Sequence, residues 1–301
     1  MRLGMIGLGR MGMNMCRRVI LGGHTVAAFD MDQGKRNEAA DAGIQFADSV
    51  AALVAMLPCP RAVWIMLPAG GPVDEAIKTL RPLLAPGDYI IDGGNSFYKD
   101  DLRRAEELKG TGINYVDAGV SGGIWGLKNG YALMAGCTPE QFKHMEPVFK
   151  SLAPPDGYMR CGPVGAGHFV KMVHNGIEYG MMEAYAEGFE LLKASRYGAE
   201  ADLAGVAALW NNGSVIRSWL LELVEDALKK DKDLASIRGF VEDSGEGRWT
   251  VAEAIETGVF LPVITESLMR RLRSRQTDPF AEKVLAAMRA GFGGHAVKKR
   301  E

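Results

Sequence analysis

The sequence predicts an α/β fold: a Rossmann-type, doubly wound parallel sheet at the N-terminus, followed by an all-α C-terminal domain. In the first half of the chain, short apolar runs alternate with longer amphipathic stretches, a pattern typical of βαβ units. After about residue 165 the strand signals nearly vanish and long helical patterns follow. The 301 residues are enough for two domains of ordinary size. We place the boundary at the glycine-rich stretch GPVGAG, which gives domains 1–165 and 166–301.

The predicted strands are short apolar segments that end at glycine or proline turns. They span residues 3–9, 25–30, 62–68, 89–95 and 115–123, and residues 131–136 and 157–162 are candidates for edge strands. A helix over 10–23, ended by two glycines, joins the first two strands. In the second domain, helical patterns cover residues 166–196, 200–230, 248–274 and 278–290.

The composition limits the classes of partner. Hydrophobic residues make up 47% and charged residues 24%, and the net charge is −2, so no overall field attracts nucleic acid or an anionic membrane. No apolar run approaches the roughly 18 to 20 residues that span a bilayer, and the N-terminus enters an apolar strand without a charged leader. We expect a cytoplasmic protein whose four cysteines are reduced and inert.

The motif GLGRMG predicts a dinucleotide site, because it follows a predicted strand and opens a predicted helix. Its glycines permit a tight turn, a close approach of the pyrophosphate to the main chain, and packing of the helix on the sheet. The alternative is a glycine-rich turn that binds nothing. The motif predicts that six residues bind the cofactor: Gly7, Leu8, Gly9, Arg10, Met11 and Gly12.

Asp30 closes the second predicted strand, where a carboxylate can accept both ribose hydroxyls and repel a 2′-phosphate. Lys35 and Arg36 lie nearby and could serve a 2′-phosphate instead. We therefore expect NAD as the preferred cofactor, with NADP as the alternative. Leu67 and Pro68, at the end of the strand 62–68, are assigned to the same site.

The helix that begins near residue 166 carries an unusual polar stripe: Lys171, His174, Asn175 and Glu178. At about 100° per residue, these four side chains fall within an arc of about 100°. A solvated face would more often repeat Glu, Lys and Gln, so we expect this stripe to face a cleft. The alternative is a surface stripe with a chance Lys–Glu pair.

The chain resembles 6-phosphogluconate dehydrogenase, the decarboxylating enzyme of the pentose phosphate pathway and of gluconate utilization, within the β-hydroxyacid dehydrogenase superfamily. The motifs that carry the resemblance run from end to end: GLGRMG, DGGNS (92–96), GVSGG (119–123), GAGHFVKMVHNGIEYG (165–180), GEGRWT (245–250) and RAGFGGH (289–295). The length indicates the short form of the family, without the extra helical repeat of the long form.

The resemblance implies roles for the polar stripe. Lys171 corresponds to the general base and Glu178 to the general acid, while Asn175 and His174 hold substrate hydroxyls and the nicotinamide end of the site. Asn95 would lie between cofactor and substrate.

The resemblance also implies a binding set for the sugar acid. Its carboxylate end would be bound by the turn Ser121, Gly122 and Gly123, and its phosphate by Tyr179, Arg248, Thr250 and Arg275. Arg289 and His295 correspond to a pair that reaches the neighbouring subunit's site, which implies a homodimer or homotetramer.

Two departures from the long form stand out. Ile124 and Trp125 follow the serine turn where acidic residues are usual, and Arg248 stands where lysine is common, which keeps the cation but changes its geometry.

The expected reaction is oxidative decarboxylation of 6-phospho-D-gluconate to D-ribulose 5-phosphate and CO2 with reduction of NAD, and it requires no metal. The rival functions are another β-hydroxyacid dehydrogenase acting on an unphosphorylated acid, and a non-catalytic NAD-binding redox sensor. His24, His144 and His168 show no partner pattern and receive no role.

Overall fold

The computed structural model describes residues 1–293 and 296–298. The chain divides into two compact units, Met1–His174 and Asn175–Glu301. One helix, α8 (Ala166–Ala194), continues from the first unit into the second. The boundary between domains at residue 165 therefore stays a prediction.

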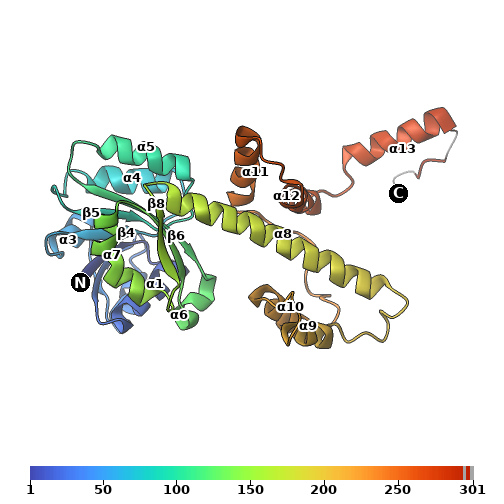
Figure 1. The fold of residues 1–301 in the computed structure, drawn as a ribbon, viewed down its shortest axis with the longest axis horizontal. Coiled ribbons are helices and arrows are strands. Elements are labelled where there is room, and N and C mark those ends of the chain that lie inside the picture. The colour runs from blue at the N-terminus through green and yellow to red at the C-terminus, as the bar shows by residue number, and fades with distance from the viewer. Residues whose placement is uncertain (294–295, 299–301) are drawn as a thin grey trace. The chain divides into compact units, whose positions relative to one another are not determined.

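The first unit, described in full, is built on an eight-stranded sheet with the order β3-β2-β1-β4-β5-β6-β7-β8 (Figure 1). The order of β1 to β6 is that of a doubly wound Rossmann sheet. The strands are β1 (Arg2–Ile6), β2 (Thr25–Phe29), β3 (Gln45–Phe46), β4 (Ala62–Ile65), β5 (Tyr89–Asp92), β6 (Asn114–Ser121), β7 (Ala132–Gly136) and β8 (Tyr158–Gly162). The helices are α1 (Arg10–Leu21), α2 (Lys35–Asp41), α3 (Val50–Ala55), α4 (Gly71–Leu80), α5 (Tyr98–Leu108), α6 (Gly126–Asn129) and α7 (Pro139–Leu152).

Two strands, β7 and β8, run opposite to the other six. β7 pairs antiparallel to β6, with Asp117 opposite Gly136, and β8 then pairs parallel to β7. The connection between β6 and β7 holds only a 3-10 turn, Gly123–Trp125, and the single turn α6, and is too short for the crossover that a parallel neighbour requires. The predicted fold class is confirmed, and both candidate edge strands lie at this edge of the sheet.

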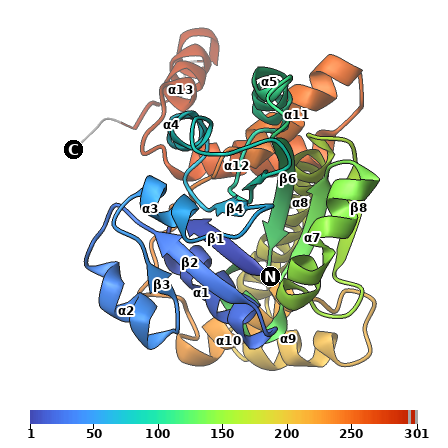
Figure 2. The same cartoon turned by 90° about the vertical axis from the view of Figure 1, so that its left-hand side faces the viewer.

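Helices cover both faces of the sheet (Figure 2). Trp64 of β4 packs into one buried cluster with α1 and α7, while its neighbours Val63 and Ile65 pack into a second cluster with α3, α4 and α5. β4 is therefore apolar and buried at every position, as expected of a strand covered on both faces.

The second unit consists of the C-terminal part of α8 and further helices. These are α9 (Leu203–Asn211), α10 (Trp219–Lys230), α11 (Glu246–Thr257), α12 (Pro262–Ser274) and α13 (Phe280–Gly293). In the part of the chain that is described, no helix combines the length and the apolar character needed to cross a membrane.

Two of the long helical patterns are each split into two helices. Gly213, with φ of +100°, follows the end of α9. Ser218 then caps the start of α10, because its side chain accepts the N–H of Leu221. Gly258 ends α11 in the left-handed conformation, and Pro262 occupies the first turn of α12. In both cases the amphipathic pattern continues across the break, and local capping residues divide it into two helices.

Gly12 and Gly9 provide a matched pair for testing how α1 packs. A Cβ on Gly12 would lie 2.1 Å from the carbonyl oxygen of Gly7, whereas a Cβ on Gly9 would meet nothing within 4 Å. We expect Gly12→Ala to lower the free energy of unfolding by about 2 kcal/mol, although alanine favours a helix, because overpacking displaces α1. Gly9→Ala serves as the control in the same urea titration, and equal stability of the two variants would contradict this account.

Candidate active site

The glycine loop lies at the carboxyl end of β1, beside β4, where the strand order reverses. Gly7 has φ of +97°, and a Cβ there would lie 2.4 Å from the carbonyl oxygen of Met66. Only glycine suits that turn, and the open space around Gly9 leaves room for a ligand to approach the main chain. α1 begins directly afterwards, so its unpaired N–H groups and positive dipole end are suited to phosphate.

A cleft of about 620 Å³ opens in the first unit at this point. Gly7, Asp30, Leu67 and Pro68 lie in its lining, so the ends of three strands bring four of the predicted cofactor residues together. The remaining residues of the motif, Leu8 to Gly12, complete the loop and the start of α1. The residues present therefore fit a dinucleotide.

Asp30 ties the end of β2 to the glycine loop. One carboxylate oxygen accepts the N–H of Leu8 at 2.6 Å, and the other accepts the N–H of Asp32 at 2.8 Å. Each oxygen retains a further lone pair, so the group can still accept hydroxyl donors from the cleft.

Lys171 is buried in the second turn of α8, and its Nζ donates a hydrogen bond to Oδ1 of Asn95. The helix approaches β6 closely at Gly119, where a Cβ would lie 2.6 Å from Cβ of Lys171 and 3.0 Å from the carbonyl oxygen of Gly167. The first glycine of GVSGG is thus required for packing, and it allows the lysine to reach the turn that follows β5.

Asp117, in the middle of β6, binds the start of α8. Its two carboxylate oxygens accept the N–H of Gly165 at 2.6 Å and the N–H of His168 at 2.8 Å. These N–H groups have no partner within the helix, so the carboxylate serves as a cap supplied by the sheet. Burial raises the pKa of Asp117 to about 7, against the opposing effect of the nearby His168.

His168 forms a fully buried pair with Asp101 of α5, at 2.7 Å between Nδ1 and Oδ2. Burial alone would lower the pKa of the imidazole, but the Asp101 carboxylate outweighs it and raises the pKa to about 9. Tyr115 donates its hydroxyl to the other oxygen of Asp101 at 2.8 Å. The charge pair therefore joins α8, α5 and the sheet beneath Lys171.

Asp92 holds the turn that carries Asn95. Its oxygens accept the N–H of Gly94 at 3.0 Å and the hydroxyl of Ser96 at 2.7 Å, while Arg104 donates to it at 3.0 Å. Asp92, Asp101 and His168 lie close enough together to be candidate metal ligands. The Arg104 guanidinium, within 3.0 Å of Asp92 and 3.8 Å of Asp101, already supplies positive charge at this cluster.

The predicted carboxylate-binding turn follows β6 directly. Ser121 ends the strand, and Gly122 and Gly123 have φ of +136° and +52°, conformations that favour glycine. Ile124 and Trp125, the departures from the long form, are largely exposed.

In the second unit, glycines allow α8 and α11 to pack closely. A Cβ on Gly176 would lie 2.9 Å from the Thr250 methyl group, and a Cβ on Gly247 would lie 2.6 Å from the Tyr179 ring. Asn175 donates to Glu246 at 2.9 Å, and this glutamate is buried. The motifs around residues 175–180 and 245–250 are thus in direct contact.

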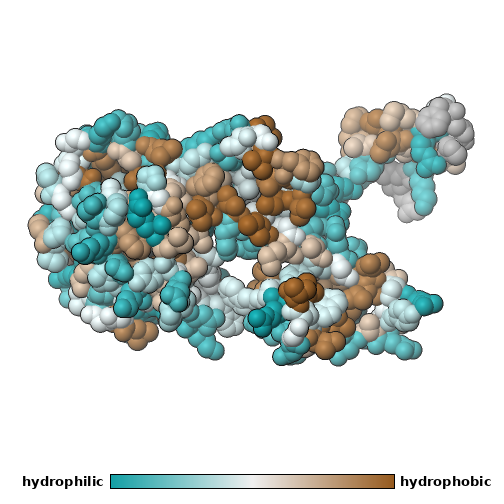
Figure 3. Space-filling view, viewed as in Figure 1, coloured by the Kyte–Doolittle hydropathy of each residue, from teal (hydrophilic) through white to brown (hydrophobic). Residues whose placement is uncertain are grey.

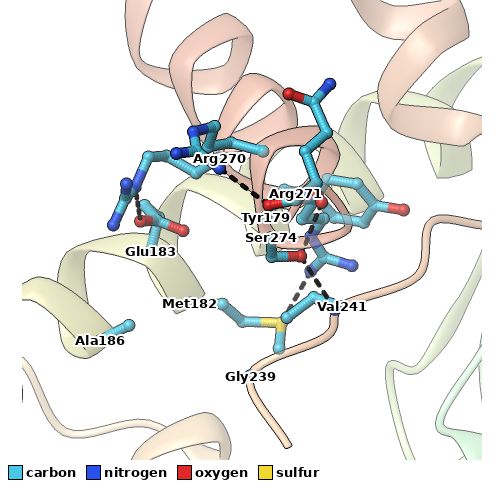
Figure 4. A pocket seen from close by; sticks show the side chains of 11 residues that line it. Tyr179, Met182, Glu183, Ala186, Gly239, Val241, Arg270, Arg271 and Ser274 are labelled. Atoms are coloured by element: carbon cyan, nitrogen blue, oxygen red, sulfur yellow. Dashed lines mark hydrogen bonds and ion pairs between the residues drawn. The ribbon is translucent and has the colours of Figure 1, made fainter. Parts of the chain in front are cut away.

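Tyr179 borders a pocket of about 520 Å³ in the second unit (Figure 4). The Arg271 guanidinium lies over the Tyr179 ring, 3.5 Å from the centroid. The Tyr179 hydroxyl accepts a hydrogen bond from the N–H of Ser244 at 3.3 Å. Arg270 pairs with Glu183 at 3.2 Å on the wall of the same pocket.

Arg248 and Arg275, the two arginines among the four predicted phosphate ligands, converge on Asp243. Arg248 donates to both of its carboxylate oxygens, at 2.9 and 3.0 Å, and Arg275 donates to one at 2.8 Å. The hydrogen bonds from Arg248 are the main cause that lowers the pKa of Asp243 to about 2.

For the other predicted site residues the structure gives the helix and the degree of burial. His174 and Glu178 are half-buried on α8, and Arg289 is exposed on α13. His295 lies outside the described residues. Their roles stay predictions.

Sequence reasoning missed five charged or titratable residues that hold the predicted site residues or their helices. Asp101, Asp117 and His168 belong to the first unit, and Asp243 and Glu246 to the second. His168 stands 67 positions from its partner, and no spacing pattern connects the two. Asp243 offered the only usable signal, an acidic residue five positions before a predicted phosphate-binding arginine.

Comparison with protein families accounts for nearly the whole chain. Residues 2–165 match the NAD binding domain of 6-phosphogluconate dehydrogenase, and residues 167–299 match the C-terminal domain of the same enzyme.

Individual relatives agree. The chain is 46% identical over its whole length to the NAD(+)-dependent, decarboxylating 6-phosphogluconate dehydrogenase of Haloferax volcanii, and 45% identical to YqeC of Bacillus subtilis; in both cases it spans 100% of the relative. It is also similar to the solved structure of Plasmodium falciparum 6-phosphogluconate dehydrogenase, described with NADP+ and with 6-phosphogluconate. The TM-score is 0.84 at 28% identity, and the match covers 100% of this chain and 67% of the other.

Replacing Asp101 tests the buried charge pair. Asp101→Asn leaves His168 buried without its carboxylate, so we expect the free energy of unfolding to fall by about 3 kcal/mol near pH 6.5. A raised histidine pKa contributes stability that is fully present below about pH 6.5 and is lost as the pH rises through about 9. The difference between variant and parent should therefore shrink toward pH 9.

The control is Glu106→Gln, which removes an exposed carboxylate paired with Lys109 on the same helix. It should change stability by less than about 1 kcal/mol at either pH. A difference for Asp101→Asn that stays constant from pH 6 to 9 would refute the ionised pair.

Proposed function

The chain belongs to the 6-phosphogluconate dehydrogenase family, and on that premise we propose that it converts 6-phospho-D-gluconate to D-ribulose 5-phosphate and CO2 while reducing NAD. The observation that carries this proposal for the site is the buried Lys171, bonded to Asn95 at the carboxyl end of the parallel sheet. Ligands of doubly wound folds bind at that end. We place the reaction in the cytoplasm, within the pentose phosphate pathway.

Lys171 acts both as a base and as an acid in the proposed mechanism. Uncharged, it accepts the proton of the substrate's C3 hydroxyl as the hydride leaves that carbon. When bound, the nicotinamide ring supplies the hydride acceptor. As an ammonium group, Lys171 then donates to the ketone oxygen, which stabilises the charge that develops as the β-keto acid loses CO2. Asn95 orients the amine through their hydrogen bond.

Glu178, protonated, delivers a proton to carbon when the enediol forms the ketone product, while Lys171 takes back the proton of the enol hydroxyl. It lies seven residues after Lys171 on α8, about 10 Å along the helix axis. That separation suits opposite sides of a short sugar chain. Asn175, held by Glu246, and His174 would bind the hydroxyls between them.

NAD is the preferred cofactor in this proposal, with NADP as the alternative. Asp30 presents a carboxylate at the cleft, where a 2′-phosphate would be repelled. Lys35 pairs with Glu38, and Arg36 pairs with Asp48 and lies over the Phe46 ring. Both cations considered for a 2′-phosphate therefore have carboxylate partners.

One kinetic experiment tests this assignment: initial rates with 6-phosphogluconate under NAD and under NADP, measured side by side, with CO2 release followed. We expect turnover with both products and a higher kcat/KM for NAD. Lys171→Met should lower kcat about a thousandfold or more, because base and acid are lost together. Lys193→Met, an exposed lysine of the same helix, is the control.

Three outcomes would contradict parts of the proposal. Faster turnover of unphosphorylated gluconate would point to another hydroxyacid substrate. NAD binding without turnover would indicate a redox sensor. Full activity of Lys171→Met would remove the lysine from the mechanism.

A second copy of the chain completes the site in our proposal, through Arg289 and His295. α13 exposes Phe280, Leu285 and Met288 by 79%, 57% and 51%, an apolar face that a partner would cover. Hydrophobic residues also gather on the surface over α11 and α12 (Figure 3). The proposed assembly is a homodimer or a homotetramer.

Subunit complementation tests the tail. Arg289→Ala and Lys171→Met should each be nearly inactive, but mixed oligomers should regain activity, because one site then combines an intact Lys171 with an intact partner tail. Removal of residues 289–301 should abolish activity while NAD binding persists. A fully active monomer, or mixtures that stay inactive after proven subunit exchange, would refute action between subunits.

A further inference from the structure

Asp243 lies at the centre of a bracket formed by residues 241–244, the segment just before α11. Its side chain is 5% exposed and accepts three hydrogen bonds from Arg248 and Arg275. The two arginines come from different helices: Arg248 from the first turn of α11 and Arg275 from the end of α12. One carboxylate therefore fixes their relative position.

The bracket is itself anchored to α12 and α8. Val241 donates its N–H to the Ser274 hydroxyl at 3.0 Å and accepts the Nε–H of Arg275 at 2.8 Å. The N–H of Ser244 bonds to the Tyr179 hydroxyl at 3.3 Å. The main chain on both sides of Asp243 is therefore anchored, so the position of the carboxylate does not depend on the two arginines alone.

The charges leave a net cationic site. Asp243 supplies one negative charge against two guanidinium groups, and its hydrogen bonds with Arg248 keep it ionised throughout the neutral range. The contacts described use two of the five donors on each guanidinium. Side-chain exposure of 51% for Arg248 and 25% for Arg275 leaves further donors accessible.

We infer that Asp243 is a positioning residue, which holds Arg248 and Arg275 as one oxyanion-binding pair and so sets the preference for a phosphorylated over an unphosphorylated sugar acid. This inference rests on the proposed function for the identity of the substrate. A free arginine pays rotamer entropy when it binds phosphate, and the shared carboxylate removes much of that cost beforehand. The rival role is that of a carboxylate that competes with phosphate for the same two arginines.

Asp243→Asn separates the two roles, because it keeps the side-chain volume and removes the charge. If Asp243 positions the arginines, the Kd of inorganic phosphate, measured by calorimetry on the full-length protein, should rise about tenfold. KM for 6-phosphogluconate should rise by a similar factor while kcat changes less than about threefold, since ground-state and transition-state binding are lost equally. The kcat/KM for gluconate should stay unchanged. Asp233→Asn, an exposed aspartate of the same interhelical segment, is the control.

Phosphate binding that is unchanged or tighter in Asp243→Asn would overturn the inference in favour of competition. Asp243→Glu retains the charge but moves it outward, so it should weaken phosphate binding to an intermediate degree; equality with the parent would also overturn the inference. If Asp243→Asn fails to fold, the Glu variant alone decides. Because calorimetry needs no turnover, a parent that binds phosphate through this pair but does not oxidise 6-phosphogluconate would defeat the proposed function and leave the arginine pair standing.

Discussion

The position of Lys171 depends on how the start of α8 is bound to the sheet. Asp117 projects from a buried strand and accepts two N–H groups from the helix terminus, so α8 cannot rotate about its axis without losing both bonds. Glycine at position 167 lets the helix backbone approach β7, since a Cβ there would lie 2.3 Å from the Met134 carbonyl oxygen. Lys171, one turn further, is then directed at the turn that carries Asn95.

Buried carboxylates orient functional groups in both units, but with different electrostatics. Asp117 binds main-chain N–H groups in an apolar setting, so burial dominates and its pKa rises to about 7. Asp243 binds two guanidinium groups nearer the surface, so hydrogen bonding dominates and its pKa falls to about 2. The same residue type, aspartate, therefore serves as a helix cap in one unit and holds two arginines in the other.

Several glycines in the family motifs serve packing rather than ligand contact. Gly12 meets the glycine loop, Gly119 meets Lys171, and Gly247 meets the Tyr179 ring, each at a distance that excludes a Cβ. A motif that marks a ligand site thus also records where helices approach a sheet or one another. This explains why such short patterns can specify both a fold and a site.

The sequence by itself determined the features that are encoded within about thirty residues: the βαβ units, the glycine loop, Asp30 at the end of its strand, and the polar stripe on α8. Periodicity and local end signals carry such information, because the interacting groups are close in the chain. Only the tertiary structure decided the reversed direction of β7 and β8, the pairing of His168 with Asp101, the cap by Asp117 and the clamp by Asp243. The partner of a buried charge depends on which strands and helices are neighbours in space. Contacts between residues 32 to 67 positions apart produce no periodic pattern in the sequence.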